Sequence, residues 1–176
     1  MNVICFGDSN TYGYDPRSYL GGRYAADSRW VDILAEETGW TVRNLGENGR
    51  EIPTSVPDFP ADTDLLIIML GTNDLLQGRS PEQAVKRLDR FLSGISLDRS
   101  KILVIAPPPM TLGAWVPASS SLMTPTPLSG SVRPWRSIWH LLRRRGKWDI
   151  PLAYDGVHFM EQGHRAFAAG LLEELK

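Results

Sequence analysis

The chain has 176 residues, of which 42% are hydrophobic and 22% are charged, and its formal net charge is −1. This length and composition suit one domain with its own hydrophobic core, so we treat residues 1–176 as a single domain. Because neither sign of charge dominates, nothing favours a nucleic acid or an acidic membrane surface as a partner.

The cysteine content and the start of the chain bear on where the protein works. Cys5 is the only cysteine, so no intramolecular disulfide can form, and its place in an apolar run predicts a buried, inert thiol. The first residues lack the basic and apolar regions of a secretory signal, and the longest apolar run, 65–70, is too short to span a bilayer. We therefore expect a cytoplasmic protein without a membrane span.

Strands and helices are predicted to alternate along the chain. Apolar runs indicate buried strands, and apolar residues at helical spacing behind a capping residue or a proline indicate helices. Such alternation predicts a parallel sheet with helices on both faces. In chain order we expect a strand at 3–6, a helix over 28–38, strands at 41–45 and 64–70, a helix from Ser80, a strand at 101–106, a helix over 135–145, an extended run at 150–154 and a final helix ending at Leu175.

Two of these helices have recognisable first residues. Asp27 or Ser28 is expected to cap the helix over 28–38, and Gly39 is expected to end it. Ser80 is followed by a proline and then by Gln83, which is the spacing of a capping box.

The segment 110–134, rich in proline and serine, predicts no regular element. A lid, a loop that binds a partner and disorder are all open for it. Trp115, Trp135, Trp139 and Trp148 lie within or just after it. We favour packing against the sheet for these side chains, with an aromatic wall for an acyl or aryl group as the alternative. An exposed Trp115 or Trp135 would suit a contact between subunits of a homo-oligomer.

Residues with the functional groups of acyl transfer follow the ends of the predicted strands. In a doubly wound parallel sheet these loops open on one edge. Acyl transfer needs a nucleophile, a base, a group that orients the base, and donors for the oxyanion. Ser9, His158 and Asp155 can fill the first three roles. The backbone N–H groups of Ser9 and Gly49 and the side chain of Asn73 can fill the fourth.

Each of these signals also has a simpler interpretation. A Gly-Asp-Ser segment after a strand occurs as an ordinary turn or helix cap, as 7–9 would here. The Asp-x-x-His at 155–158 also occurs as a local hydrogen-bonded turn. Of the other two histidines, His140 and His164 fall in predicted helices, where we expect structural or surface roles.

Four segments together resemble the four blocks of a known family, and they occur in its order over nearly the whole chain. They are Gly7-Asp8-Ser9, Asn44-Leu45-Gly46-Glu47-Asn48-Gly49, Gly71-Thr72-Asn73-Asp74 and Asp155-Gly156-Val157-His158. The family is the SGNH hydrolases, also called GDSL-type esterases and lipases, and the likeness is greatest to its bacterial arylesterase branch. The resemblance implies a flavodoxin-like, three-layer α/β/α fold with a parallel sheet of four to five strands.

The same resemblance implies a serine esterase that hydrolyses small carboxylic esters, with short acyl or aryl groups, through an acyl-enzyme. It implies Ser9 as the nucleophile, His158 as the base and Asp155 as the partner that orients it. Ser9, Gly49 and Asn73 would form the oxyanion hole. No metal or cofactor is needed, and the G-x-S-x-G elbow of the α/β-hydrolases does not occur in the sequence.

Two features depart from the family pattern. Asn10 stands where the family has the leucine of GDSL, a change that we expect to be mild. The run 152–154 leads directly into Asp155, so the fifth strand that normally precedes this block is short or lost. The position of Asp155 and His158 relative to Ser9 therefore depends on the tertiary structure.

Two other hypotheses account for part of the pattern. A flavodoxin-like binding module would hold a phosphate or flavin with 9–13, but the blocks at Asn73 and His158 would then be coincidences. A degenerate hydrolase would keep the fold with a misaligned triad, and would bind esters without turnover. For an active enzyme, acetylated sugars, aryl esters, lysophospholipids and thioesters are all open as natural substrates.

Overall fold

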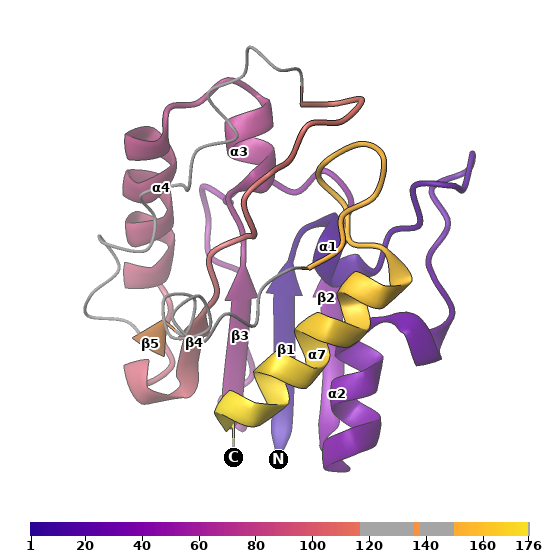
Figure 1. The fold of residues 1–176 in the computed structure, drawn as a ribbon. Coiled ribbons are helices and arrows are strands. Elements are labelled where there is room, and N and C mark those ends of the chain that lie inside the picture. Colours follow the sequence, from indigo (N-terminus) through magenta and orange to yellow (C-terminus); the bar gives the residue numbers. More distant parts are fainter. Residues whose placement is uncertain (117–135, 138–149, 176) are drawn as a thin grey trace.

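A five-stranded parallel sheet runs through the centre of the computed structural model, which describes residues 1–116, 136–137 and 150–175 (Figure 1). Its strands are β1 (Asn2–Gly7), β2 (Thr41–Gly46), β3 (Leu65–Met69), β4 (Ile102–Val104) and β5 (Arg136–Ser137). They lie in the order β2-β1-β3-β4-β5, and every neighbouring pair is parallel. The predicted parallel α/β sheet is confirmed.

Helices cover both faces of this sheet. α2 (Trp30–Thr38) and α7 (Glu161–Leu175) lie together on one face, and α4 (Pro81–Ser93) lies on the other (Figure 1). Two short helices, α1 (Ser9–Tyr12) and α3 (Thr72–Leu76), follow the ends of β1 and β3. Short 3-10 turns occupy Ala26–Ser28 and Arg99–Lys101. No helix in the described part of the chain is long and apolar enough to cross a membrane.

The two-sided core follows from the alternation of side chains along each strand. In β1, Val3 and Cys5 pack towards α2 and α7, whereas Ile4 and Phe6 pack towards α4. All five residues of β3 are buried for the same reason, which explains its continuously apolar sequence. Cys5 is fully buried, as predicted, and burial raises the pKa of its thiol.

The start of α2 differs from the prediction. Neither Asp27 nor Ser28 caps it, because both lie in the 3-10 turn before it, and the capping position falls to Arg29, which makes no side-chain cap bond. The hydroxyl of Ser28 donates to Asp27 and accepts from Arg165 of α7, so it is used to join two elements instead. Gly39 ends α2 in the left-handed conformation, with φ of 67°, as predicted.

The start of α4 agrees with the prediction. Ser80 N donates to the Gln83 side chain at 2.8 Å, and Gln83 N donates to Ser80 Oγ at 3.3 Å. These reciprocal bonds form the capping box, with proline at the first helical position.

The fifth strand is present but has only two residues. Arg136–Ser137 pairs with Leu103 and Val104, so these two residues form a strand and are not part of the helix predicted over 135–145. Strand pairing satisfies the backbone groups on the outer edge of β4, which a helix there would leave open. The predicted helical residues 138–145, His140, three of the tryptophans and most of the segment 110–134 lie outside the described residues.

Candidate active site

Three strands end at the same level of the sheet, and the candidate site lies beyond them. Gly7 at the end of β1 is in register with the last residues of both β2 and β3. Ser9, Gly49 and Asn73 follow these three ends along the chain. The register therefore brings three of the predicted residues to one edge, as expected for a parallel sheet.

The turn that presents Ser9 is tightly packed. A Cβ at Gly7 would lie 2.1 Å from Thr11 Oγ1, so only glycine fits there. Asp8 caps α1 by accepting from Asn10 N at 3.0 Å, and burial raises the pKa of Asp8 to about 6 against the opposing effect of this bond. Ser9 is the first residue of α1 and is only 5% exposed.

Ser9, His158 and Asp155 form one hydrogen-bonded chain. His158 Nε2 lies 2.9 Å from Ser9 Oγ, and His158 Nδ1 lies 2.7 Å from Asp155 Oδ2. All three side chains are buried. The short approach to Asp155 therefore does not misalign these residues, and the misalignment on which the degenerate-hydrolase hypothesis depends is absent here.

The carboxylate of Asp155 determines which nitrogen of His158 carries the proton. An ionised carboxylate only accepts hydrogen bonds, so Nδ1 donates to it and Nε2 is left to accept from the Ser9 hydroxyl. The backbone N–H groups of Val157 and His158 donate to Asp155 Oδ1 at 2.9 and 3.0 Å. Burial acts to raise the pKa of Asp155, but the hydrogen bonds from His158 and from these backbone groups hold it below its ordinary value.

The segment 110–116 is bonded directly to the segment that carries Asp155. Thr111 N donates to Gly156 O at 2.9 Å, and Trp115 N donates to Asp155 O at 3.2 Å. Gly156 has φ of 78°, and a Cβ there would lie 2.1 Å from Thr111 O, so the approach of the two backbones requires glycine. These contacts hold the segment that carries Asp155 against 110–116.

Two aromatic rings flank His158. The ring centroid of Tyr14 lies 4.6 Å from that of His158, and the centroid of Trp115 lies 5.0 Å from it. Trp115 is 51% exposed, so the expected core packing is wrong for this residue. Its backbone bonds turn it out of the core and towards the site. Sequence reasoning did not single out Tyr14, because its aromatic ring in a glycine-rich loop carries no local signal of this contact.

Asn73 is held by the loop that contains Gly49. Its Nδ2 donates to Arg50 O at 3.0 Å, which uses one of two amide protons and leaves the other available. Arg50 donates to Gly7 O at 3.0 Å and also to Leu45 O, so it ties the ends of β1 and β2 together. Gly49 is exposed and has φ of 74°.

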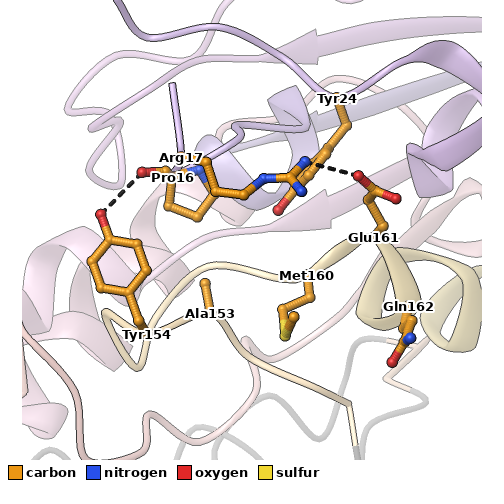
Figure 2. Close-up of a pocket in the computed structure, with 8 residues that line it drawn as sticks. All are labelled: Pro16, Arg17, Tyr24, Ala153, Tyr154, Met160, Glu161 and Gln162. Atoms are coloured by element: carbon orange, nitrogen blue, oxygen red, sulfur yellow. Dashed lines mark hydrogen bonds and ion pairs between the residues drawn. The ribbon is translucent and has the colours of Figure 1, made fainter. Parts of the chain in front are cut away.

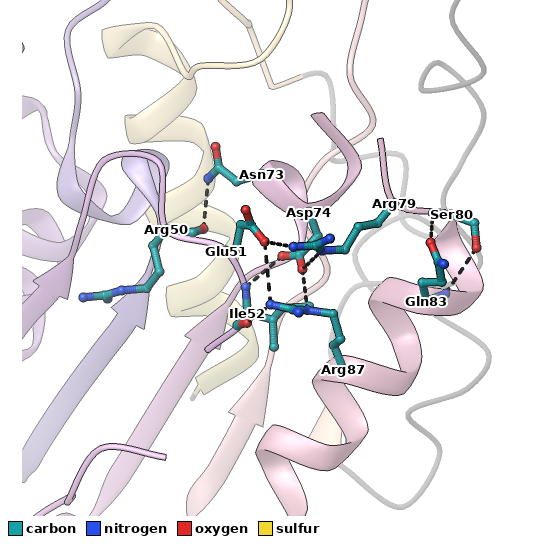
Figure 3. A network of polar contacts seen from close by, with 9 residues as sticks. All are labelled: Arg50, Glu51, Ile52, Asn73, Asp74, Arg79, Ser80, Gln83 and Arg87. Atoms are coloured by element: carbon teal, nitrogen blue, oxygen red, sulfur yellow. Dashed lines mark hydrogen bonds and ion pairs between the residues drawn. The ribbon is translucent and has the colours of Figure 1, made fainter. Parts of the chain in front are cut away.

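A network of charged side chains surrounds the buried Asp74 of α3 (Figure 3). Asp74, next to Asn73 in α3, is fully buried and pairs with Arg87 Nε at 2.9 Å and Arg79 Nε at 3.4 Å. Its second oxygen accepts from Ile52 N at 2.8 Å. The network thus joins α3 and α4 to the loop after β2.

Comparison with models of known protein families gives one match. The model of the GDSL-like Lipase/Acylhydrolase family matches residues 5–166. The chain belongs to this family. It is therefore a carboxylic ester hydrolase, and a serine mechanism is typical of the family. No curated protein sequence matches the chain significantly.

Solved structures with the same fold include esterases. An inhibitor-bound aryl esterase of M. smegmatis superposes with a TM-score of 0.73 at 23% identity, covering 99% of this chain and 97% of that one. A carbohydrate acetylesterase family member of Sinorhizobium meliloti has a TM-score of 0.67 at 23% identity, covering 99% and 96%. A member of the lipolytic G-D-S-L family from Veillonella parvula has a TM-score of 0.66 at 26% identity, covering 98% and 97%.

A pocket of about 290 Å³ lies beside the segment that carries the histidine (Figure 2). Tyr154 donates to Pro16 O at 3.0 Å on one side of it, and Arg17 pairs with Glu161 at 2.8 Å on another. The residues that line it include neither Ser9 nor His158. These two contacts join the loop after α1 to Tyr154 and to the first residue of α7, on either side of His158 in the chain.

The remaining described histidine, His164, has a structural role as expected. It is fully buried in α7 and packs its ring against Tyr24 and Phe159, with centroid distances of 5.5 and 5.2 Å. Burial lowers its pKa to about 3, so it stays neutral in the folded protein.

Proposed function

We propose that Ser9, His158 and Asp155 are the catalytic triad of this esterase. The observation that carries the proposal is that buried His158 bonds Ser9 Oγ at 2.9 Å and Asp155 Oδ2 at 2.7 Å at the same time. Ser9 Oγ attacks the ester carbonyl while His158 Nε2 takes its proton. His158 then protonates the leaving alcohol, and a water activated by His158 hydrolyses the acyl-enzyme.

The oxyanion of each tetrahedral intermediate is assigned to three donors. These are the backbone N–H groups of Ser9 and Gly49 and the Nδ2 group of Asn73. The register of the strand ends supports this assignment, as does the bond from Asn73 to Arg50 O, which orients the amide. Such prearranged donors stabilise charge without reorganising during the reaction.

The substrates that we propose are small esters with short acyl or aryl groups. The rings of Tyr14 and of half-exposed Trp115 both contact the ring of His158, and they offer flat apolar surfaces for such groups. A phosphate- or flavin-binding module gains no support from the buried chain of Ser9, His158 and Asp155. The cytoplasmic location and the homo-oligomer stay predictions.

Hydrolysis of p-nitrophenyl acetate, butyrate and octanoate by wild type and Ser9→Ala tests the triad. We expect Ser9→Ala to remove nearly all turnover, and Asn73→Ala to lower kcat about a hundredfold or more. Ser28→Ala is the matched control, because Ser28 is also 5% exposed but its hydroxyl bonds Asp27 and Arg165 instead of His158. Equal activity in wild type and Ser9→Ala would refute the triad, and a rate that rises towards octanoate would refute the short-chain preference.

A further inference from the structure

The side chain of Asn10 bonds to both chain neighbours of His158. Its Nδ2 donates to Val157 O at 3.1 Å, and its Oδ1 accepts from Phe159 N at 2.8 Å. Asn10 is 2% exposed, so water does not compete for these bonds. The residue that follows Ser9 in the chain is thus joined to the backbone immediately before and after His158.

Asn10 is itself held firmly in place. Its backbone N–H donates to Asp8 Oδ1 at 3.0 Å, and its carbonyl accepts from Trp30 Nε1 at 2.9 Å. Trp30 is buried and packs edge-on against Phe167, with a centroid distance of 5.0 Å. The amide of Asn10 therefore connects the segment that carries His158 to α1 and, through Trp30, to the aromatic core.

We propose that Asn10 is a positioning residue that keeps His158 at the right distance from Ser9 throughout the catalytic cycle. This inference rests on the proposed roles of Ser9 and His158. The direct bond between Ser9 Oγ and His158 is lost when Ser9 is acylated, because the hydroxyl proton has gone. The two bonds of Asn10 involve only backbone groups around His158, so they persist in the acyl-enzyme and hold the base for the attack of water.

Leucine, the residue of the family name, cannot make these bonds. With leucine at position 10, the buried N–H of Phe159 and the C=O of Val157 would lose their partners. From the sequence alone asparagine was expected to be a mild change here. The two bonds could not be predicted, because Val157 and Phe159 lie at the other end of the chain. A shift of about 1 Å in a catalytic group can cost about a hundredfold in rate.

The test compares Asn10→Leu with Asn44→Leu. Asn44 is the matched control, because its amide also donates to a carbonyl of α1, Thr11 O at 2.9 Å, and accepts from a backbone N–H, that of Gly46 at 2.9 Å. It makes no bond to the segment around His158. We expect Asn10→Leu to lower kcat for p-nitrophenyl acetate about 10- to 100-fold with KM changed less than about threefold. We expect Asn44→Leu to lower Tm while kcat stays within about threefold.

Asn10→Asp provides a second readout that a purely structural role would not produce. A protonated carboxyl can donate to Val157 O and accept from Phe159 N, as the amide does, whereas an ionised carboxylate cannot donate. The kcat of this variant relative to wild type, corrected for the folded fraction by circular dichroism, is therefore expected to fall as the pH rises. A constant ratio would count against the proposal, as would equal losses of kcat in Asn10→Leu and Asn44→Leu.

The outcomes separate this proposal from the one on which it rests. Full activity in Ser9→Ala would refute the triad itself. Loss of activity in Ser9→Ala with wild-type kcat in Asn10→Leu would leave the triad standing and overturn only the role of Asn10. If Asn10→Leu does not fold, the pH dependence of Asn10→Asp decides the question.

Discussion

Replacing Gly156 by alanine should disturb the site more than an alanine at another glycine of the same conformation. Gly156 has φ of 78°, and its Cβ would lie 2.1 Å from the carbonyl oxygen of Thr111. Gly39, at the end of α2, has φ of 67° with no atom within 4 Å of its Cβ. Gly39→Ala therefore measures the cost of the left-handed backbone alone, and Gly156→Ala measures that cost plus the clash.

The size of the difference follows from the contacts. An alanine in the left-handed conformation costs about 1 kcal/mol, which is our expectation for Gly39→Ala. At Gly156 the obstacle is backbone, so the two segments must separate and the bond from Thr111 N to Gly156 O is strained or lost. A buried group left without its partner adds about 1–3 kcal/mol. We expect about 3 kcal/mol in total for Gly156→Ala, or a fall in Tm of about 10 °C in a chain of this size.

Thermal unfolding and ester hydrolysis together test this reasoning. Because Gly156 lies next to Asp155, its displacement should also lower kcat/KM for p-nitrophenyl acetate by about tenfold or more, measured below the Tm of each variant. Gly39→Ala should keep the wild-type kcat/KM. The reasoning is refuted if the two variants have the same Tm and the same kcat/KM, because the contact between 110–116 and the segment of Asp155 would then position nothing.

Two further predictions concern buried ionisable groups. Asp74→Asn removes the charge that pairs with Arg87 and Arg79. Because both guanidinium groups are partly exposed, we expect urea unfolding to show that the free energy of unfolding falls by about 2 kcal/mol. A fall of less than about 0.5 kcal/mol would mean that the network contributes little to stability. His164, with its pKa lowered to about 3, binds a proton in the unfolded chain but not in the folded one between pH 6.5 and 3, so its contribution to stability is lost as the pH falls through this range. From pH 7 to pH 5, wild type should lose about 2 kcal/mol more than His164→Leu, and parallel curves of unfolding free energy against pH would exclude this role.

Much of the fold could be predicted because it depends on local sequence. The apolar run of β3 and the capping residues of α4 identify a strand and a helix without reference to the rest of the chain. The order of strands and helices then implies a parallel sheet. Once the sheet is parallel, Ser9, Gly49 and Asn73 must follow strand ends on one edge, and the four sequence blocks together indicate the family.

The element boundaries that were predicted wrongly are those that depend on contacts with residues far away in the chain. The first turn of α2 shifted because Ser28 bonds to Arg165 of α7, and a strand formed at 136–137 because β4 offered an open edge. Trp115 faces His158 and not the core because its backbone is bonded to Asp155 O. None of these partners is near in the chain, so no local pattern encodes them.

The sequence by itself determined which residues are the candidates for the chemistry, and the tertiary structure decided how they are held. Serine, histidine and aspartate in their blocks could be identified by residue type and order alone. The bonds from Asn10 to the neighbours of His158 join residues that lie at opposite ends of the chain. Such contacts exist only after the chain has folded, because their energy depends on two distant segments being brought to the same edge of the sheet.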